Sequence, residues 1–550
     1  MKLNASIVRT LGSKYTLYTL LTSWIVVIIF SNFVLPPSDD GKTYFEPALG
    51  FLHGRVQWGD FIGDEFNPKY TMFPTFSFFQ FIFFYITSLF KIPINFYTYR
   101  MFHMFLILTL ILLSVYLLFL YFRKIKNSDY IIKSNVFIIL LSITPFAQQC
   151  WQVRPEIFGS VLIITSLIFY VHWELTKQKN LTFYYLCALF IGLSATVHPN
   201  ISLISCVITL SIMLINIKKG DLFSSFVFGV VAVIPVSILV SWYLAFYPES
   251  IMEFKINMIG HKGFLGGIRK LIDEALMLGA WKSMAIKAFY FMFWFPFLVV
   301  ILTTTALVFK KVKKLTYYDN FNHILIAIYV SIILLMIINR GDDSYFVIFS
   351  CFISLVFVSL LRFDEDNSGY QYNKGFLSKF VLMLLVFIVF LHTSVHITKR
   401  HLSSEKYYFA PRTHKIVESS LKAEDTLFIT KSRQVACFID LLDAKYRDDH
   451  TSNNIFIVFA EPKLDYDKIK LRLILMNKVE NITHDSTVWG VWKNSTNFDR
   501  ENMKLIWRYE YQPKKSNPLH LHFDVKTIIY EDKDHLFFRP EMIVFKENIL

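Results

Sequence analysis

The chain has 550 residues, of which 54% are hydrophobic and 17% aromatic, including 57 Phe. This composition excludes an ordinary soluble protein, because apolar runs recur through roughly the first 400 residues. The net charge of +14 comes from basic residues dispersed among the turns, which fits a membrane surface and excludes the basic stripe of a nucleic-acid-binding protein.

Apolar segments follow one another along most of the chain. The first comes after Lys2, Arg9 and Lys14, and it is too long for the core of a signal peptide, so we expect a retained helix. The segments are 17–37, 74–90, 97–122, 134–150, 157–174, 181–197, 200–217, 222–246, 286–309, 322–339, 344–361 and 376–397. They predict a polytopic α-helical membrane protein.

The basic turns decide which segments cross. If 74–90 does not cross, every basic turn lies on the side of the N-terminus, as the positive-inside rule requires. These turns are 123–133, 174–180, 218–221 and 310–314. We therefore predict eleven spans, a cytoplasmic N-terminus and an external C-terminus, with 74–90 in the outer interface. The alternative, in which 74–90 is a true second span, stays open.

The turns left outside hold nearly all the unusual polar residues near the membrane. They are 36–96, 150–156, 197–200, 247–285 and 339–344. Acids, histidines and cations gather there, which predicts chemistry on the external face. The residues are Asp39, Asp40, Asp60, Arg154, Glu156, His198, Asn200, His261, Lys262, Arg340, Asp342 and Asp343.

Asp39 and Asp40 form the sharpest signal, because a charge so near hydrocarbon costs a few kcal/mol unless it lines a wet or polar site. Paired carboxylates can bind a metal, or one can act as a base while the other holds it in place. The alternative is that the pair only caps the next helix, since Asp favours an N-cap and the first turn.

Arg154, Pro155 and Glu156 follow an apolar run and return to apolar sequence at Ile157. Two interpretations stay open. The two charges form a local pair that anchors the helix, or Glu156 adds a second acid to the site while Arg154 holds a phosphate. His198 interrupts an apolar stretch on the same face, as a polar helix end or as a ligand.

Three weaker signals lie on the predicted external face. His261, Lys262 and Arg269 stand among glycines, where backbone N–H groups can approach an anion, although an amphipathic interface helix is the alternative. Arg100 lies just inside the span 97–122, and Arg340 is followed by Tyr345 at another span mouth. The aliphatic part of such an Arg commonly extends along the span so that its charge reaches the membrane interface. This purely structural role is an alternative that stays open for both arginines.

The sequence becomes polar after 397. Helices are expected near 412–421, 432–443 and 464–475, and strands at 426–430, 455–460, 488–492, 505–511 and 527–530. We predict two domains: a transmembrane domain, 1–397, with the first external loop at 36–96, and a small external α/β domain, 398–550.

One set of residues forms a pattern that is shared with a known family. It consists of Asp39-Asp40-Gly41, Tyr44, Leu52-His53-Gly54, Asp60-Phe61, Arg100, Arg154-Pro155-Glu156 and the stretch from Arg340 to Tyr345. The pattern resembles that of bacterial GT-C glycosyltransferases, which depend on polyprenyl-phosphate sugars and are related to protein O-mannosyltransferases and lipid A aminoarabinose transferases. The resemblance covers about 1–400 in architecture and departs at His198, where relatives often have Lys.

The resemblance implies a GT-C-like fold with interfacial helices in the first loop, in a bacterial inner membrane. It implies transfer of a sugar from a polyprenyl-phosphate donor to a periplasmic glycan, lipid or protein, with inversion. Asp39, Asp40 and Glu156 would be catalytic, and Asp40 and Glu156 would hold Mg²⁺ or Mn²⁺ if a divalent cation takes part. The substrate-binding residues would be Tyr44, Asp60, Arg100, Arg154, His198, His261, Lys262, Arg269, Arg340 and Tyr345.

Other functions remain open at this stage. A membrane transporter would place polar residues deep inside its spans and break helices in paired halves, and neither pattern is visible in the sequence. A non-catalytic membrane scaffold with an external interaction domain is a third hypothesis. Among enzymes, an oligosaccharide transferase or ligase of the same superfamily is a further alternative.

Overall fold

The structure is a computed structural model. It describes residues 10–34, 39–54, 59–62, 65–68, 75–125, 130–144, 146–147, 154–176, 178–246, 299–309, 320–338, 346–360, 426–429, 454–457, 488–493, 504–509, 519–531 and 535–546. These residues belong to two compact units. The helical unit is made from Met1–Ser31, Tyr70–Thr75 and His103–Ile397, and the mixed unit from Asn32–Lys69, Phe76–Phe102 and Thr398–Leu550.

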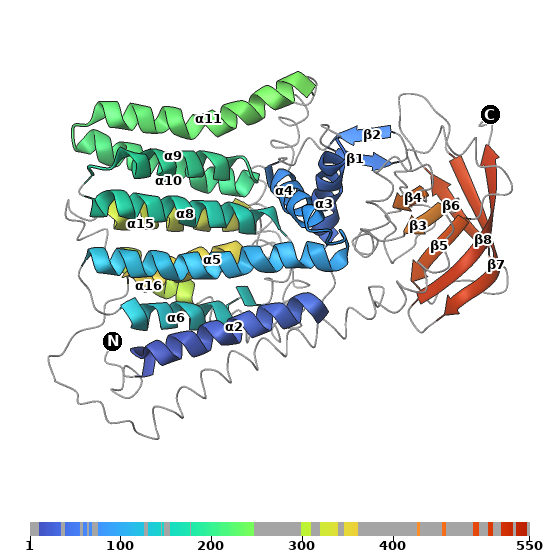
Figure 1. Ribbon diagram of the computed structural model, residues 1–550, viewed down its shortest axis with the longest axis horizontal. Helices are drawn as coiled ribbons and strands as arrows, with labels where there is room; N and C mark the ends of the chain where they lie inside the picture. The colour runs from blue at the N-terminus through green and yellow to red at the C-terminus, as the bar shows by residue number, and fades with distance from the viewer. Residues whose placement is uncertain are drawn as a thin grey trace, which may run out of the picture. The chain divides into compact units, whose positions relative to one another are not determined.

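Helices form where the apolar segments predict them. The long ones run side by side in the helical unit (Figure 1). Their bounds are α2 Lys14–Val34, α5 Phe96–Lys124, α6 Tyr130–Ile143, α8 Pro155–Leu175, α9 Leu181–Ala195, α10 Pro199–Lys218, α11 Leu222–Phe246, α15 Asn320–Ile338 and α16 Phe346–Leu360, with a further helix at Val299–Phe309. The expected span 376–397 lies outside the described residues.

Four helices of the described chain are long and apolar enough to cross a membrane. They are Tyr97–Lys124, Pro155–Leu175, Pro199–Lys218 and Leu222–Trp242. The 21 residues of α8 reach about 31 Å at 1.5 Å per residue, close to the thickness of a hydrocarbon core. The other apolar helices have shorter fully described stretches, of 10–17 residues, among them α4, Thr75–Leu89, which occupies the segment predicted to lie in the interface.

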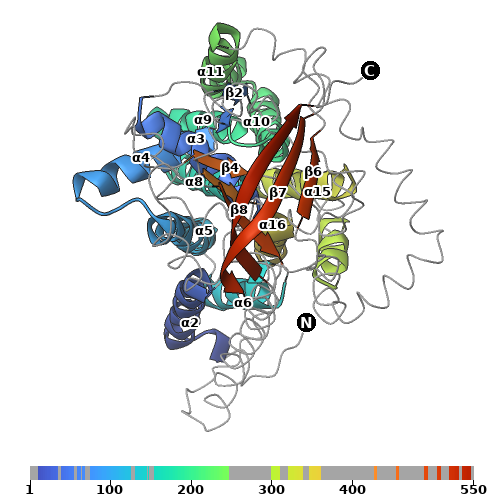
Figure 2. The same ribbon diagram turned by 90° about the vertical axis from the view of Figure 1, so that its right-hand side faces the viewer.

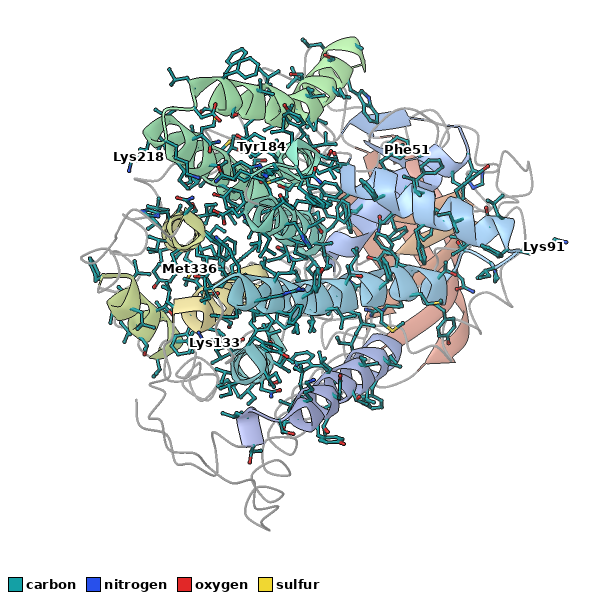
Figure 3. All side chains as sticks on the ribbon, turned by 60° about the vertical axis from the view of Figure 1, so that its left-hand side comes forward. Phe51, Lys91, Lys133, Tyr184, Lys218 and Met336 are labelled. Carbon is teal, nitrogen blue, oxygen red and sulfur yellow. The ribbon has the colours of Figure 1, made fainter. Side chains whose placement is uncertain are left out.

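Small residues let the helices approach closely. A Cβ added to Gly192 of α9 would lie 2.1 Å from the carbonyl oxygen of Ala232 in α11, so only glycine fits this crossing. Polar side chains join the same helices in the interior. Tyr184 of α9 donates to the carbonyl of Ser224 at 2.9 Å and accepts from Asn216 of α10, and it lies within the bundle (Figure 3).

The described residues of three basic turns lie near one another at one end of the helical unit, where Lys124 and Lys219 both approach Glu174. Glu174, near the C-terminus of α8, pairs with Lys124 at the end of α5 and accepts a hydrogen bond from Asn320 at the start of α15, at 3.2 Å.

The position of Lys133 differs from the predicted one. It was assigned to a turn, but it belongs to α6, is 2% exposed, and holds its ammonium 3.7 Å from the ring centre of Phe122.

The mixed unit contains a helix that the sequence pattern did not predict, α3, Asp39–Leu52. Its inner face buries Tyr44, Phe45, Ala48 and Leu49. The ring of Tyr44 meets that of Phe76 in α4 edge-on at 5.3 Å. Aromatic packing therefore stabilises a helix that contains an internal proline.

A six-stranded sheet completes the mixed unit, and Figure 2 shows its long, twisted strands. The order is β4-β3-β5-β8-β7-β6, with β3 parallel to β4 and β5 and the other pairs antiparallel. The strands are β3 Thr426–Ile429, β4 Asn454–Ile457, β5 Val488–Lys493, β6 Lys504–Tyr509, β7 Leu519–Glu531 and β8 His535–Lys546. The five predicted strands are present, β7 is longer than predicted, and β8 was missed. The helices predicted after 397 lie outside the described residues.

Candidate functional site

Two helices of the helical unit begin side by side at the end opposite Glu174. α8 begins at Pro155 and α10 at Pro199, and the residue before each proline is extended. Proline suits the first helical position because its fixed φ is helical and its missing N–H would have no partner there. The sequence therefore starts both helices at defined residues and places Arg154 and His198 immediately before them.

The two helices approach closely one turn further in. A Cβ on Gly159 of α8 would lie 2.8 Å from both Cγ atoms of Ile201 in α10. Gly159 follows Glu156 by one helical turn, and Ile201 follows His198 in the same way. The missing side chain of Gly159 thus determines how near Glu156 and His198 come, and nothing in the sequence pattern had marked this glycine.

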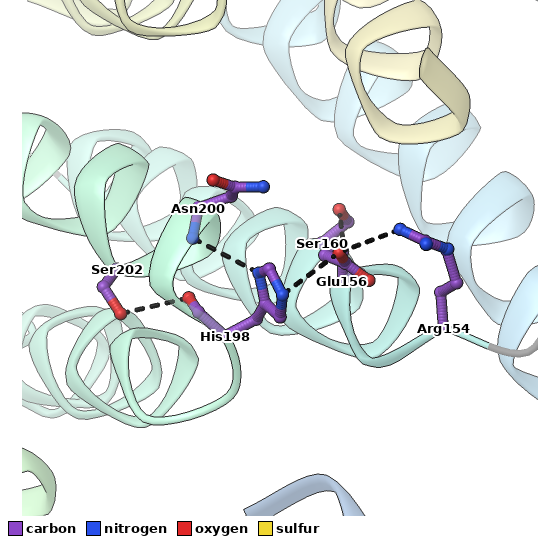
Figure 4. Close-up of polar contacts among 6 residues, drawn as sticks. All are labelled: Arg154, Glu156, Ser160, His198, Asn200 and Ser202. Atoms are coloured by element: carbon purple, nitrogen blue, oxygen red, sulfur yellow. Dashed lines mark hydrogen bonds and ion pairs between the residues drawn. The ribbon is translucent and has the colours of Figure 1, made fainter. Parts of the chain in front are cut away.

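Glu156 is the centre of the site (Figure 4). Its side chain is 1% exposed, and its Oε1 lies 3.3 Å from Nη1 of Arg154 and 3.4 Å from Nε2 of His198. Its other oxygen, Oε2, is buried and has no hydrogen-bond partner among the residues that the structure describes. A buried carboxylate oxygen is costly to leave without a donor, so Oε2 marks a position where a substrate group can donate.

Arg154 and Glu156 therefore form the local pair that was one of the two sequence interpretations. The guanidinium lies two residues from the carboxylate, and the Arg154 side chain is only 10% exposed. The phosphate-binding role of Arg154 remains a prediction. The first turns of α8 and α10 add two positive dipole ends beside this cation, an environment that favours an anion.

His198 is held from both sides of its ring. Its Nδ1 accepts the backbone N–H of Asn200 at 3.3 Å, which caps α10, and its Nε2 faces Glu156. The hydroxyl of Ser202 supports this turn by donating to the carbonyl oxygens of Ala195 and His198 (Figure 4). His198 is thus a polar helix end that also faces the acid, and its role as a ligand remains a prediction.

The other predicted residues are placed as follows. Asp39 and Asp40 occupy the first turn of α3, where a capping pair would also lie, so that alternative remains open. Tyr44 and Arg100 are buried in the mixed unit, and Asp60 belongs to β1, Gly59–Ile62, which pairs with β2, Glu65–Pro68. His261, Lys262, Arg269, Arg340 and Tyr345 lie outside the described residues.

The described residues do not by themselves fit a divalent cation. No three His, Cys, Asp or Glu side chains come together among them. Glu156 offers a single open oxygen, because Oε1 already faces two nitrogen groups, and the surrounding positive charge disfavours a metal ion there. We therefore derive no step through a cation.

Comparison with known proteins gives distant likenesses only. No family model matches the chain. No curated protein matches it either. Among solved structures, it is similar to the Archaeoglobus fulgidus oligosaccharyltransferase tethered to an acceptor peptide, with 11% identity over 88% of this chain and 69% of that chain, at a TM-score of 0.47. The apo form of that enzyme is similar with 12% identity over 88% of this chain and 70% of that chain, at a TM-score of 0.46.

A third solved structure is the archaeal oligosaccharyltransferase AglB from the same organism, in complex with an inhibitory peptide and a dolichol-phosphate. The identity is 12%, the coverage 87% of this chain and 70% of that chain, and the TM-score 0.41. At this identity and these TM-scores the likeness does not decide the activity of this chain. The proposed function is therefore argued from the geometry of the site.

Proposed function

We propose that the chain is an integral-membrane glycosyltransferase that moves a sugar from a polyprenyl-phosphate donor to an acceptor on the external side. The observation that carries the proposal is the buried Glu156. One of its oxygens faces Arg154 and His198, and the other has no donor within the described part of the chain. This arrangement lies at the end of an apolar helix bundle, where a membrane lipid headgroup would arrive.

In the proposed reaction a carboxylate of the first loop takes the proton of an acceptor hydroxyl. The acceptor oxygen forms a bond to the anomeric carbon as the bond between that carbon and the phosphate oxygen breaks. The electron pair leaves with the lipid phosphate, and the sugar inverts. Asp39 aligns with the first acid of the family pattern, so we assign it as the base and Asp40 as its neighbour.

The helical unit supplies charge stabilisation and orientation in this proposal. Arg154 and the N-termini of α8 and α10 stabilise the negative charge that develops on the leaving phosphate. Oε2 of Glu156 accepts a hydrogen bond from a substrate hydroxyl and so fixes the sugar relative to the attacking group. Both tasks use groups that the bundle already holds in place.

The first experiment incubates the purified protein with a panel of polyprenyl-phosphate sugars and measures released lipid phosphate. We expect release with at least one donor, and a loss of about 100-fold or more in D39N or D40N, the range typical for removal of a general base. No release with any donor would favour a transporter or scaffold, and full activity in both variants would remove the first-loop acids from the reaction.

The expected Mg²⁺ or Mn²⁺ at Asp40 and Glu156 remains a separate prediction, although the described surroundings of Glu156 disfavour a cation. Chelation before the same assay, followed by addition of Mg²⁺ or Mn²⁺, tests it. Activity that survives chelation would show that the carboxylates work without a cation.

A further inference from the structure

We infer that His198 is a positioning residue for Glu156, with its Nδ1 committed to capping α10 and its Nε2–H directed at Oε1 of the carboxylate. The inference deepens the proposed function and rests on it where activity is the readout. Its foundation is the geometry of one imidazole ring between two partners (Figure 4).

The cap determines which nitrogen carries the proton. Nδ1 of His198 accepts the N–H of Asn200 at 3.3 Å, so its lone pair is occupied and the neutral ring has its proton on Nε2. Nε2 lies 3.4 Å from Oε1 of Glu156. The backbone of α10 therefore determines the tautomer of His198 and directs its Nε2–H toward Glu156.

This arrangement excludes His198 as a general base. A ring whose Nδ1 accepts a backbone N–H and whose Nε2 bears the proton has no lone pair left to act as a general base. Protonation at Nδ1 would place two N–H donors face to face and break the cap. His198 consequently acts through Glu156 and helps to fix which carboxylate oxygen faces the substrate.

The fixed oxygen is Oε2, because Oε1 is held from two directions. Arg154 approaches it at 3.3 Å from the same helix, and His198 approaches it from α10. One contact alone would leave the carboxylate free to rotate about its terminal torsion, which is broad for Glu. Two contacts from different helices restrict that rotation and present a single buried acceptor.

The cap and the positioning role can be separated by mutation. H198N retains a side-chain oxygen that can accept the N–H of Asn200, but the new side chain is too short to reach Glu156. H198A removes both interactions. Asn180 is the matched control, because its side chain caps α9 by accepting the N–H of Thr182 at 3.0 Å and it lies far from the site on the exposed surface.

The activity test compares H198N, H198A, N180A, E156Q and the double variant H198N/E156Q in the lipid-phosphate release assay. We expect kcat to fall about tenfold in H198N with little change in donor KM, the signature of a misplaced group rather than lost binding. N180A should lose thermal stability but keep kcat. The double variant should match E156Q within about twofold, because residues that act as a unit are not additive.

A spectroscopic test is independent of activity. Ring-¹⁵N-labelled histidine spectra of the membrane-embedded protein, with His198 identified by its loss in H198N, should show an unprotonated Nδ1 and a protonated Nε2. The resonance should move in E156Q. A proton on Nδ1, or an unchanged resonance in E156Q, would overturn the inference even if no sugar transfer were found. Full kcat in H198N would overturn it in an active enzyme.

Discussion

At the scale of single residues, the site depends on a buried acid whose charge is compensated locally. The Glu156 side chain is 1% exposed, and the guanidinium of Arg154, two positions earlier, lies 3.3 Å from its Oε1. Removing one member of a buried pair leaves the other without compensation, which costs more than the pair contributes when intact. The stability of this end of the bundle therefore depends on both residues together.

We predict that R154A lowers the free energy of unfolding by about 3 kcal/mol, within the range for a broken buried ion pair. The double variant R154A/E156Q should recover part of this loss, because the neutral amide does not need a counter-charge. Thermal unfolding in detergent measures both, and R154K controls for the loss of charge. An R154A protein as stable as the wild type would show that the pair is not energetically coupled to the fold.

The sequence identified Arg154, Glu156 and His198 but not how they are connected. Their polarity at span ends is visible in the composition of the outer turns. The nitrogen by which His198 contacts the acid is decided by the cap on Asn200, and this depends on backbone geometry. Gly159 was not identified either, because a lone glycine in an apolar run has no pattern of its own.

At the scale of elements, the spacing between α8 and α10 is a structural requirement of the site. Gly159 and Ile201 are in contact one turn below Glu156 and His198, and an added Cβ would come within 2.8 Å of the Ile201 side chain. A contact below 3.0 Å forces something to shift. The polar contacts of Glu156, at 3.3 and 3.4 Å, are already near the upper limit of hydrogen-bond distances. A small separation of the two helices therefore weakens them.

We predict that G159A destabilises the protein by about 1–3 kcal/mol, the usual cost of overpacking, and also slows transfer. I201A should relieve the clash, so that G159A/I201A costs less than the sum of the two separate variants. G229A is the control, since its Cβ would meet only the flexible end of Met213. Additive costs in the double variant would contradict the contact as the cause.

Element prediction succeeded where one physical signal dominated and failed where two opposed each other. Apolar runs predicted most of the described helices within a few residues, although α6 ends at Ile143 and not near 150. Helix α3 was missed because Gly41, Pro47 and Gly50 argue against a helix, whereas the buried face around Tyr44 overrides that local preference.

Strand β8 was missed for a similar reason. Proline is unfavourable inside a sheet, yet Pro540 belongs to β8, which lies between β5 and β7. The register shifts between Val525 and Thr527, directly opposite Pro540. An irregularity of the ladder at that point accommodates a residue without an N–H, and the sequence of β8 alone does not reveal it.

At the scale of the whole molecule, the helical unit separates two kinds of charge. One end of α8 carries Glu174, tied to Lys124 and Asn320 near the basic turns. The other end carries Glu156, tied to Arg154 and His198. Counting basic residues predicts that the two kinds of turn face opposite sides of the membrane, and this topology remains a prediction. The number of spans and the side of the membrane remain predictions.

The measurement that tests the central claim most directly is the rate of polyprenyl-phosphate release by the wild type and by E156Q, using one labelled donor and matched amounts of folded protein. The proposed role of Glu156 predicts release by the wild type and a rate about 100-fold lower in E156Q. Equal rates in the two proteins would contradict the claim that the buried acid at the start of α8 belongs to the site of glycosyl transfer.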